Sequence, residues 1–345
     1  MSLYVENGQK IITHSMIKSM GRCPRQTMYK YYDRLKPKQL SKPLKRGNWM
    51  HSLLEAKYKN KNWKKVHKQL SRKFGQLFEE ERESLGDLPR ECKNLMNSYL
   101  WHYRDDEDWE VLEVEYTIEV MLPNGMLYRG RVDMLVSTPF GLYVVDHKTH
   151  KSLPTTFFRM QDIQSALYIW ACQQLDIDVR GFIWNYVKTI GPKPIRFNLD
   201  GAISKGGPPY KGETDYLTAK QSLIEHGDDP KDFDHVLLPL KKRRYVTGTM
   251  QTSPFFRRDV LEKDDEMLKQ VLAGVLRTAD RADTYDFEDR VGVERVIDRS
   301  CEWFCSYNDL CMTELFGGNS EQVLRQQFRV GDPMDYYYDQ KERTD

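Results

Sequence analysis

The sequence predicts an α/β protein built on a mixed β-sheet with helices on its flanks. Strand-like stretches are framed by helical ones, without the regular alternation typical of a Rossmann or barrel fold. The 345 residues suit one elaborated domain or two small ones, and we find no internal repeat or low-complexity linker. We therefore expect a mixed sheet and not a regular parallel one.

The expected elements rest on period-two alternation for strands, helical periodicity for helices, and clustered Pro and Gly for turns and loops. Helices are expected over residues 12–34, 47–73, 156–175 and 258–284, strands over 108–122, 126–136, 141–150 and 181–187, a turn at 123–125 and a loop region at 191–214.

The composition and the lack of a recognisable membrane or secretion signal indicate a cytoplasmic protein. No apolar run approaches the ~20 residues of a membrane helix, and the start "MSLYVENGQK" lacks the apolar core of a signal peptide. Six cysteines are too few for a disulfide scaffold in a chain of this size. In a reducing compartment, clustered cysteines more often bind metal or carry out redox chemistry.

Charge is distributed unevenly along the chain. Residues 1–73 hold 19 Lys and Arg against three acidic residues, a local balance of +16, although the whole chain carries only +2. Within them, "KYKNKNWKKVHKQLSRK" interleaves lysines with Tyr58 and Trp63, a composition that suits a phosphate backbone with bases stacked nearby. A solvated helix face explains this segment equally well.

The stretch "GLYVVDHKTH" runs from a buried strand directly into charged residues. With a side-chain period of two, Asp146 and Lys148 share one face, and His147 points to the other. If "STPFG" closes a hairpin, Asp133 lies within one residue of the position opposite Asp146, and we expect a bulge to bring both acids onto one face.

Two carboxylates and a lysine that converge suit a Mg²⁺ or Mn²⁺ ion, a hard cation that keeps positions open for water and a phosphate oxygen. An ordinary salt bridge between Asp146 and Lys148 explains the same residues equally well.

Further motifs surround these charges. "GNWMHSLLE" places His51 on a helix upstream of the acids, and "QSALY" places Gln164 and Tyr168 four residues apart on one helix face. With Asp133 and the Asp146-His147-Lys148 run, this order resembles the PD-(D/E)XK nuclease superfamily. Within it the chain is most similar to the RecB-like exonuclease branch, including the CRISPR-associated iron–sulfur nucleases and their bacteriophage-encoded relatives.

The resemblance implies a role for each position. His51, Asp133, Asp146 and the main-chain carbonyl of His147 would hold the metal, which polarises the phosphate and lowers the pKa of water. Lys148 would orient the attacking water and stabilise charge on the phosphate, so Asp133, Asp146 and Lys148 form the implied catalytic set. Gln164 and Tyr168 would position the DNA strand.

The cysteines form a second pattern. Cys301, Cys305 and Cys311 are spaced C-x₃-C-x₅-C, and Cys23 precedes Pro24 near the other end of the chain. Four thiolates suit a 4Fe–4S cluster, and the resemblance implies one, since iron–sulfur members join an N-terminal Cys-Pro to a C-terminal triplet. Many members have C-x₂-C-x₅-C instead. Zinc stays an alternative.

These inferences combine into one hypothesis. A restriction-endonuclease-like core, residues 45–195, lies between an N-terminal helical part, 1–44, and a C-terminal loop and helical part, 196–345, which the cluster joins. The implied activity is metal-dependent DNA exonuclease action, favouring single-stranded ends, in recombination, repair or processing. Because the sequence contains no GxxxxGK[ST] motif, unwinding would need a helicase or recombination protein partner. A non-catalytic nucleic-acid-binding or assembly protein with a structural cluster is the alternative.

Overall fold

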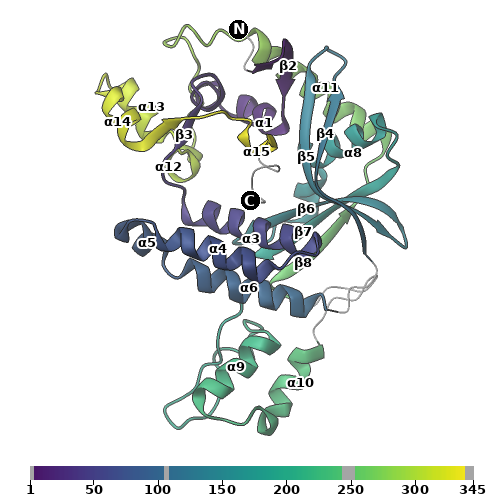
Figure 1. Cartoon of the computed structure of the whole chain (residues 1–345), viewed down its shortest axis with the longest axis vertical. Helices are drawn as coiled ribbons and strands as arrows, with labels where there is room; N and C mark the ends of the chain where they lie inside the picture. Colours follow the sequence, from purple (N-terminus) through teal and green to yellow (C-terminus); the bar gives the residue numbers. More distant parts are fainter. Residues whose placement is uncertain (1–3, 105–108, 243–252, 339–345) are drawn as a thin grey trace.

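The computed structural model describes residues 4–104, 109–242 and 253–338, and a seven-stranded mixed sheet forms its centre (Figure 1). The strands of this sheet are β1 (Val5–Glu6), β2 (Gln9–Ile12), β4 (Glu110–Met121), β5 (Leu127–Thr138), β6 (Gly141–His150), β7 (Val179–Lys188) and β8 (Phe256–Leu261). They run in the order β1-β2-β5-β6-β7-β8, and β4 pairs with β5. The β2–β5 and β6–β7 pairs are parallel and the others antiparallel. The predicted mixed α/β fold is therefore confirmed, and the sheet also recruits β1, β2 and β8 from outside residues 45–195.

Helices cover both faces of the sheet (Figure 1). On one face lie α1 (His14–Arg22), α8 (Ile163–Gln174) and α11 (Asp265–Thr284), and on the other α3 (Lys42–Tyr58) and α6 (Leu88–His102), joined by α4 (Trp63–Gly75) and α5 (Glu79–Leu85). None of the helices in the described ranges combines the length and apolar character needed to cross a membrane.

The strand β6 is buried on both faces, as its sequence predicts. Val144 belongs to the core cluster under α8, whereas Tyr143 and Val145 belong to a second cluster on the opposite face. Apolar burial on both sides stabilises the strand that carries Asp146, at about 25 cal/mol per Å² of apolar surface removed from water.

The strand β5 changes partner along one edge. Its residues 134–138 pair with β6, and its residues 127–128 pair with β2. Beyond this point β6 continues beside β7 through His150. The sheet therefore forks at residues 129–133 of β5, and a fork leaves space for side chains between the two strands.

The two ends of the chain pack together. The strand β3 (Leu35–Pro37) pairs with β9 (Phe328–Val330), and the Arg25 guanidinium lies 3.2 Å from the Glu314 carboxylate. The remaining terminal elements are α2 (Pro24–Thr27), a π-helix (Met28–Tyr32), α12 (Ser300–Phe304), α13 (Asn308–Leu315), α14 (Ser320–Gln327) and α15 (Asp335–Tyr338).

The chain segment that connects β7 to β8 forms a helical appendage, which projects from the core beyond α6 (Figure 1). It contains α9 (Tyr216–His226), a 3₁₀-helix (Pro230–Phe233) and α10 (Asp234–Lys242), which surround a small apolar core of their own. The sequence prediction included neither of these α-helices.

The helix predicted over residues 258–284 is wrong at its start, because residues 256–261 form the edge strand β8. The alternation that normally indicates a strand is inverted here: Arg258 is buried and Val260 is 53% exposed. The Arg258 guanidinium lies 3.8 Å and 3.5 Å from the ring centres of Tyr103 and Trp109. Cation–π contacts thus place a charged residue where an apolar one is expected.

The other long predicted helices are interrupted. The helix expected over 12–34 breaks at Cys23, whose backbone is extended because the following Pro24 disfavours the helical conformation. The helix expected over 47–73 breaks near Asn60, which adopts a positive φ of 54°. The helix expected over 156–175 divides into α7 (Thr156–Met160) and α8, whose N-terminus is capped by Asp162.

Candidate active site

The two predicted acids lie opposite each other on the β5–β6 hairpin. A two-residue turn connects the strands, and residues 134–138 pair with 141–145 without a register shift. One further step along this register places Asp133 opposite Asp146, where both side chains project from the same face. The expected bulge is therefore wrong, because the turn length alone sets the register that aligns the acids.

Asp133 is a buried acceptor, with 4% of its surface exposed. The main-chain N–H of His147 donates to its Oδ2 over 2.6 Å, and Nδ1 of His51 lies 3.4 Å from the same oxygen. Burial alone would raise the pKa of Asp133, but the charge of His51 and its hydrogen bond outweigh burial and hold that pKa below its usual value. The His51 pKa is raised in turn. Burial would lower it, but the charge of Asp133 outweighs burial.

Asp146 has the opposite electrostatic character. Its Oδ2 lies 2.6 Å from the Lys148 Nζ, and its Oδ1 accepts a 2.6 Å hydrogen bond from Gln164 Nε2. Burial raises the Asp146 pKa to about 6, the Lys148 charge opposes the rise, and the Asp133 charge adds to it. The predicted shared face of Asp146 and Lys148 is confirmed, and the pKa values of the two acids are driven apart.

Helix α8 brings two further predicted residues to this point. The Asp162 side chain accepts a 2.8 Å hydrogen bond from the Gln164 N–H, which fixes the start of the helix. One turn later, the Tyr168 hydroxyl donates to the Arg131 carbonyl over 2.8 Å. A Cβ at Gly130 would lie 2.6 Å from the Tyr168 ring, so a glycine is required where the ring crosses β5.

The His147 side chain lies on the opposite face of β6, as its position in the strand predicts. Its ring stacks on Tyr58 with 5.6 Å between ring centres, and its Nδ1 lies 2.7 Å from Asn185 Nδ2. Burial lowers the His147 pKa to about 3. The side chain therefore supports the fork from behind, while ligation by the His147 carbonyl stays a prediction.

A cavity of about 330 Å³ opens at the fork and is lined by His51, Asp133, Asp146, Lys148, Gln164 and Tyr168. The two terminal segments supply other walls, among them Lys30 and Met334. Concave sites with converging polar groups and shifted pKa values are typical of active sites.

His14 is a cavity residue that the sequence prediction missed. Its ring meets the Tyr168 ring edge-on at 5.9 Å, and burial, with the Lys148 charge, lowers its pKa to about 3. It reaches the cavity because β2, which ends at Ile12, pairs with β5 at the fork. The dipeptide His14-Ser15 at the start of a helix contains no sequence signal for this position.

A family model described as the PD-(D/E)XK nuclease superfamily matches residues 11–312. The match includes every residue of the acidic cavity named above except those of the C-terminal segment, and it includes all four predicted cluster cysteines. The chain belongs to the PD-(D/E)XK nuclease superfamily. It is therefore a hydrolytic nuclease, with DNA as the implied substrate, and the restriction-endonuclease-like sheet agrees with this assignment.

Solved structures give weaker likenesses to this nuclease. A candidate exonuclease from Eubacterium rectale is 12% identical, with a TM-score of 0.43 over 85% of this chain and 93% of the other. The protein SSO0001 is 14% identical, with a TM-score of 0.31 over 89% of this chain and 88% of the other. No curated protein sequence matches the nuclease. The family assignment rests on the family model.

Cys23 and the C-terminal cysteines of the nuclease lie in one region. Burial raises the Cys305 pKa, and the charges of Cys301 and Cys23 add to the rise. Cys311 contributes in the same way, after burial and Glu314, to the raised pKa of Tyr29. Within the described ranges, however, no three His, Cys, Asp or Glu side chains converge closely enough to form an assembled metal site. The predicted joining of the chain ends by a cluster is not shown. The pairing of β3 with β9 and side-chain contacts join them in this structure.

The basic helix α4 of the nuclease has an exposed lysine face. Lys64, Lys65 and Lys68 are exposed, in agreement with either a DNA-capturing or a solvated face. Its predicted stacking residues serve the interior instead. Trp63 packs against the core, and Tyr58, at the end of α3, stacks on His147 and shares a 2.6 Å hydrogen bond with Tyr99.

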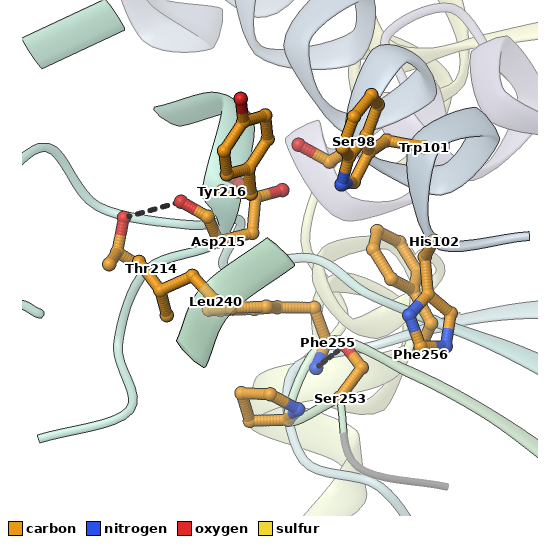
Figure 2. A pocket seen from close by; sticks show the side chains of 11 residues that line it. Ser98, Trp101, His102, Thr214, Asp215, Tyr216, Leu240, Ser253, Phe255 and Phe256 are labelled. Carbon is orange, nitrogen blue, oxygen red and sulfur yellow. Dashed lines mark hydrogen bonds between the residues drawn. The ribbon is translucent and has the colours of Figure 1, made fainter. Parts of the chain in front are cut away.

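A second, smaller cavity lies where the helical appendage meets the core (Figure 2). Trp101 and Tyr216 stack above it at 4.8 Å, and Phe255 and Phe256 line another side. Its volume of about 20 Å³ suits no more than about one water. None of the predicted site residues lines this cavity, whereas six of them line the cavity at the fork.

Proposed function

We propose that this nuclease is a metal-dependent DNA exonuclease that hydrolyses phosphodiester bonds from single-stranded ends. The observation that carries the proposal is the convergence of Asp133, Asp146 and Lys148 in one cavity, on adjacent strands of a fork. A binding module needs no lysine held against one of two buried acids, whereas hydrolysis uses such a group to stabilise developing negative charge.

The donors of the cavity are of the kinds that a hard divalent cation takes, although here, as elsewhere in the described chain, no three of them converge closely enough to form an assembled metal site. Two buried carboxylates face each other across the hairpin, with the His51 imidazole beside Asp133. Their oxygens contact His51, His147, Lys148 and Gln164, so metal binding would exchange some of these contacts for metal–ligand bonds. Asp133, Asp146, His51 and the His147 carbonyl would hold the ion. When bound, Mg²⁺ or Mn²⁺ supplies Lewis acidity and lowers the pKa of water.

The remaining side chains of the cavity would activate water and position the DNA strand. Lys148 would orient the attacking water and stabilise charge on the phosphate, because its ammonium already lies at the acids. Gln164 and Tyr168 would position the strand from α8. Both chain ends contribute walls to the cavity, and we expect this enclosure to admit a single strand more easily than a duplex.

The cysteine region supports assignment to the RecB-like iron–sulfur branch. Cys23, Cys301, Cys305 and Cys311 would hold a 4Fe–4S cluster between the two chain ends. The support is the contact between the two chain ends near these residues, where Gln26 Nε2, three positions after Cys23, lies 3.9 Å from the Cys305 Sγ. Structural zinc is the competing occupant.

Cleavage of end-labelled DNA tests the proposed function. Anaerobically purified protein should shorten single-stranded DNA progressively from a labelled end with Mg²⁺ or Mn²⁺, and EDTA should stop the reaction. A covalently closed single-stranded circle is the matched control and should persist. DNA binding without cleavage under any of these conditions would instead support a non-catalytic binding or assembly protein.

A further inference from the structure

Two adjacent aromatic side chains are exposed on the short helix that follows the catalytic strand. Phe157 is 76% exposed and Phe158 is 62% exposed, both on α7. Apolar residues scattered singly on a surface need no explanation, but neighbouring exposed rings beside an active site indicate a contact surface.

The backbone of α7 is held in place although these rings are exposed. The Arg159 side chain is buried and lies 2.8 Å from the His150 Nε2 and 3.2 Å from the Asp162 carboxylate. Lys263 also contacts the Met160 carbonyl. These contacts come from β6, from the start of α8 and from the segment after β8, so the two rings stand on a supported platform.

This platform is linked to the acidic centre, the group of Asp133, Asp146 and Lys148 in the cavity at the fork, by a short series of contacts. The Lys148 Nζ lies 5.5 Å from the ring centre of Trp184, and the Arg159 guanidinium lies 4.6 Å from the same ring. The Arg159 guanidinium is also 5.8 Å from the Phe158 ring centre. Only Trp184 and Arg159 therefore separate Phe158 from the catalytic lysine along this path.

The charges around α7 suit a polyanion. Basic side chains outnumber acidic ones around the helix. Lys148, Arg159 and Arg257 pair with Asp146, Asp162 and Asp259, Lys263 contacts the Met160 carbonyl, and Lys151, next to His150, is exposed. A nucleic-acid strand satisfies both features, because its phosphates meet the cations and its unpaired bases can cover the exposed rings.

We propose that Phe157 and Phe158 form a stacking platform for unpaired bases of the strand whose phosphate enters the acidic centre. The inference rests on the proposed function and adds a residue-level cause for single-strand preference. Bases in a duplex already stack on each other and present no free faces, whereas bases of a single strand can stack on aromatic side chains. Tyr58 and Trp63, the aromatics first expected in this role, are partly buried against the core.

The test compares a single-stranded oligonucleotide with an abasic strand of equal length, which retains the phosphates but lacks the bases. Binding is measured by fluorescence anisotropy in EDTA, so that cleavage does not interfere. The parent should prefer the base-containing strand. Phe157→Ala/Phe158→Ala should lower that affinity by at least about fivefold, leave abasic binding unchanged and keep the salt slope, because no charge is removed.

Three further variants separate stacking from other effects. Phe157→Tyr/Phe158→Tyr should retain the preference, and Phe157→Leu/Phe158→Leu should lose it, since leucine is apolar without an aromatic face. Phe140→Ala removes an exposed ring, 56% accessible, at the far end of β6 and should change nothing.

The outcomes distinguish this inference from the proposed function. If the parent cleaves DNA but the double alanine variant keeps its preference for bases, the platform is refuted and the nuclease assignment is unaffected. The same result would indicate that the rings serve another partner, such as a protein. A parent that neither binds nor cleaves DNA overturns both proposals.

Discussion

The acidic centre and the cysteine region both join distant parts of the chain, but different interactions assemble them. Strand register alone aligns Asp133 with Asp146, and main-chain hydrogen bonds maintain that alignment. A short pairing of two remote strands, β3 and β9, together with side-chain contacts such as the 3.2 Å contact of Arg25 with Glu314, brings the segment of Cys23 toward Cys305.

The difference predicts how each region responds to the loss of one member. The acidic centre is held by a sheet buried on both faces, so losing a catalytic group should affect chemistry more than folding. The cysteine region contains thiols beside a terminal interface, so losing a ligand of a bound cluster should weaken the association of the chain ends. The predictions below test this contrast.

The largest expected effect is on catalysis at Lys148. Lys148→Ala should lower the cleavage rate about 10²- to 10³-fold, because the group that stabilises the developing charge is lost, while DNA affinity and melting temperature stay close to the parent. Asp146→Ala should also abolish cleavage and should weaken Mn²⁺ binding in a titration, whereas the lysine variant still binds the ion.

A matched control for this prediction is Lys269→Ala, which removes an exposed lysine of α11 outside the cavity and should keep the parent rate. If Asp146 and Lys148 form only a structural salt bridge, both alanine variants at those positions will retain chelator-sensitive activity.

The second prediction concerns Cys301. Anaerobic preparations should be brown with about four irons per chain, and Cys301→Ser should lose iron. It should also lower the melting temperature by about 6 °C or more, because about 3 kcal/mol of cluster-coupled folding free energy is lost. Cys172→Ser, in the core away from the cluster, should keep the iron. Stoichiometric zinc without iron would refute the cluster.

The third prediction uses the raised pKa of Asp146. The folded pKa of about 6 lies above the ordinary pKa of an aspartate, so the folded state holds this proton more tightly and stability falls as pH rises from about 4 to 6. In EDTA, Asp146→Asn should therefore raise the free energy of unfolding at pH 7.5 by about 3 kcal/mol, at ~1.4 kcal/mol per pKa unit.

The control for this prediction is the same pair of proteins near pH 4, where the gain from Asp146→Asn should largely disappear. Urea unfolding at both pH values measures it. An equal gain at the two pH values would show that the effect comes from packing and not from ionisation.

The smallest expected effect on turnover concerns α4. Neutralising Lys61, Lys64, Lys65 and Lys68 together should weaken single-strand binding and lower its salt slope by up to about three units, since each lost phosphate contact removes ~0.7. Turnover of saturating DNA should change little, because these lysines are exposed outside the cavity.

Four exposed lysines of the appendage serve as the matched set for substitution, namely Lys205, Lys211, Lys220 and Lys231. Their neutralisation removes equal charge and should leave the slope unchanged. Equal salt slopes in the α4 variant and the parent would show that the lysines of α4 form a solvated helix face and not a DNA-binding surface.

Much of the acidic centre could be predicted from local pattern. Period-two alternation places Asp146 and Lys148 on one face of their strand. Helical spacing places Gln164 and Tyr168 on one face of α8. Both relations depend only on backbone geometry. The Pro after Cys23 could equally have indicated the helix break found there. Strand β8 could not be recognised in this way, because cation–π contacts from distant rings stabilise a buried Arg258.

The sequence by itself determined which faces the predicted site residues share, since side-chain periodicity is a local property of strands and helices. Only the tertiary structure decided that β5 exchanges β6 for β2, opening the fork and bringing His14 into its cavity. It also decided that Tyr58 packs inward while Phe157 faces solvent. Exposure and partner exchange depend on contacts between segments far apart in the chain, and no local pattern contains those contacts.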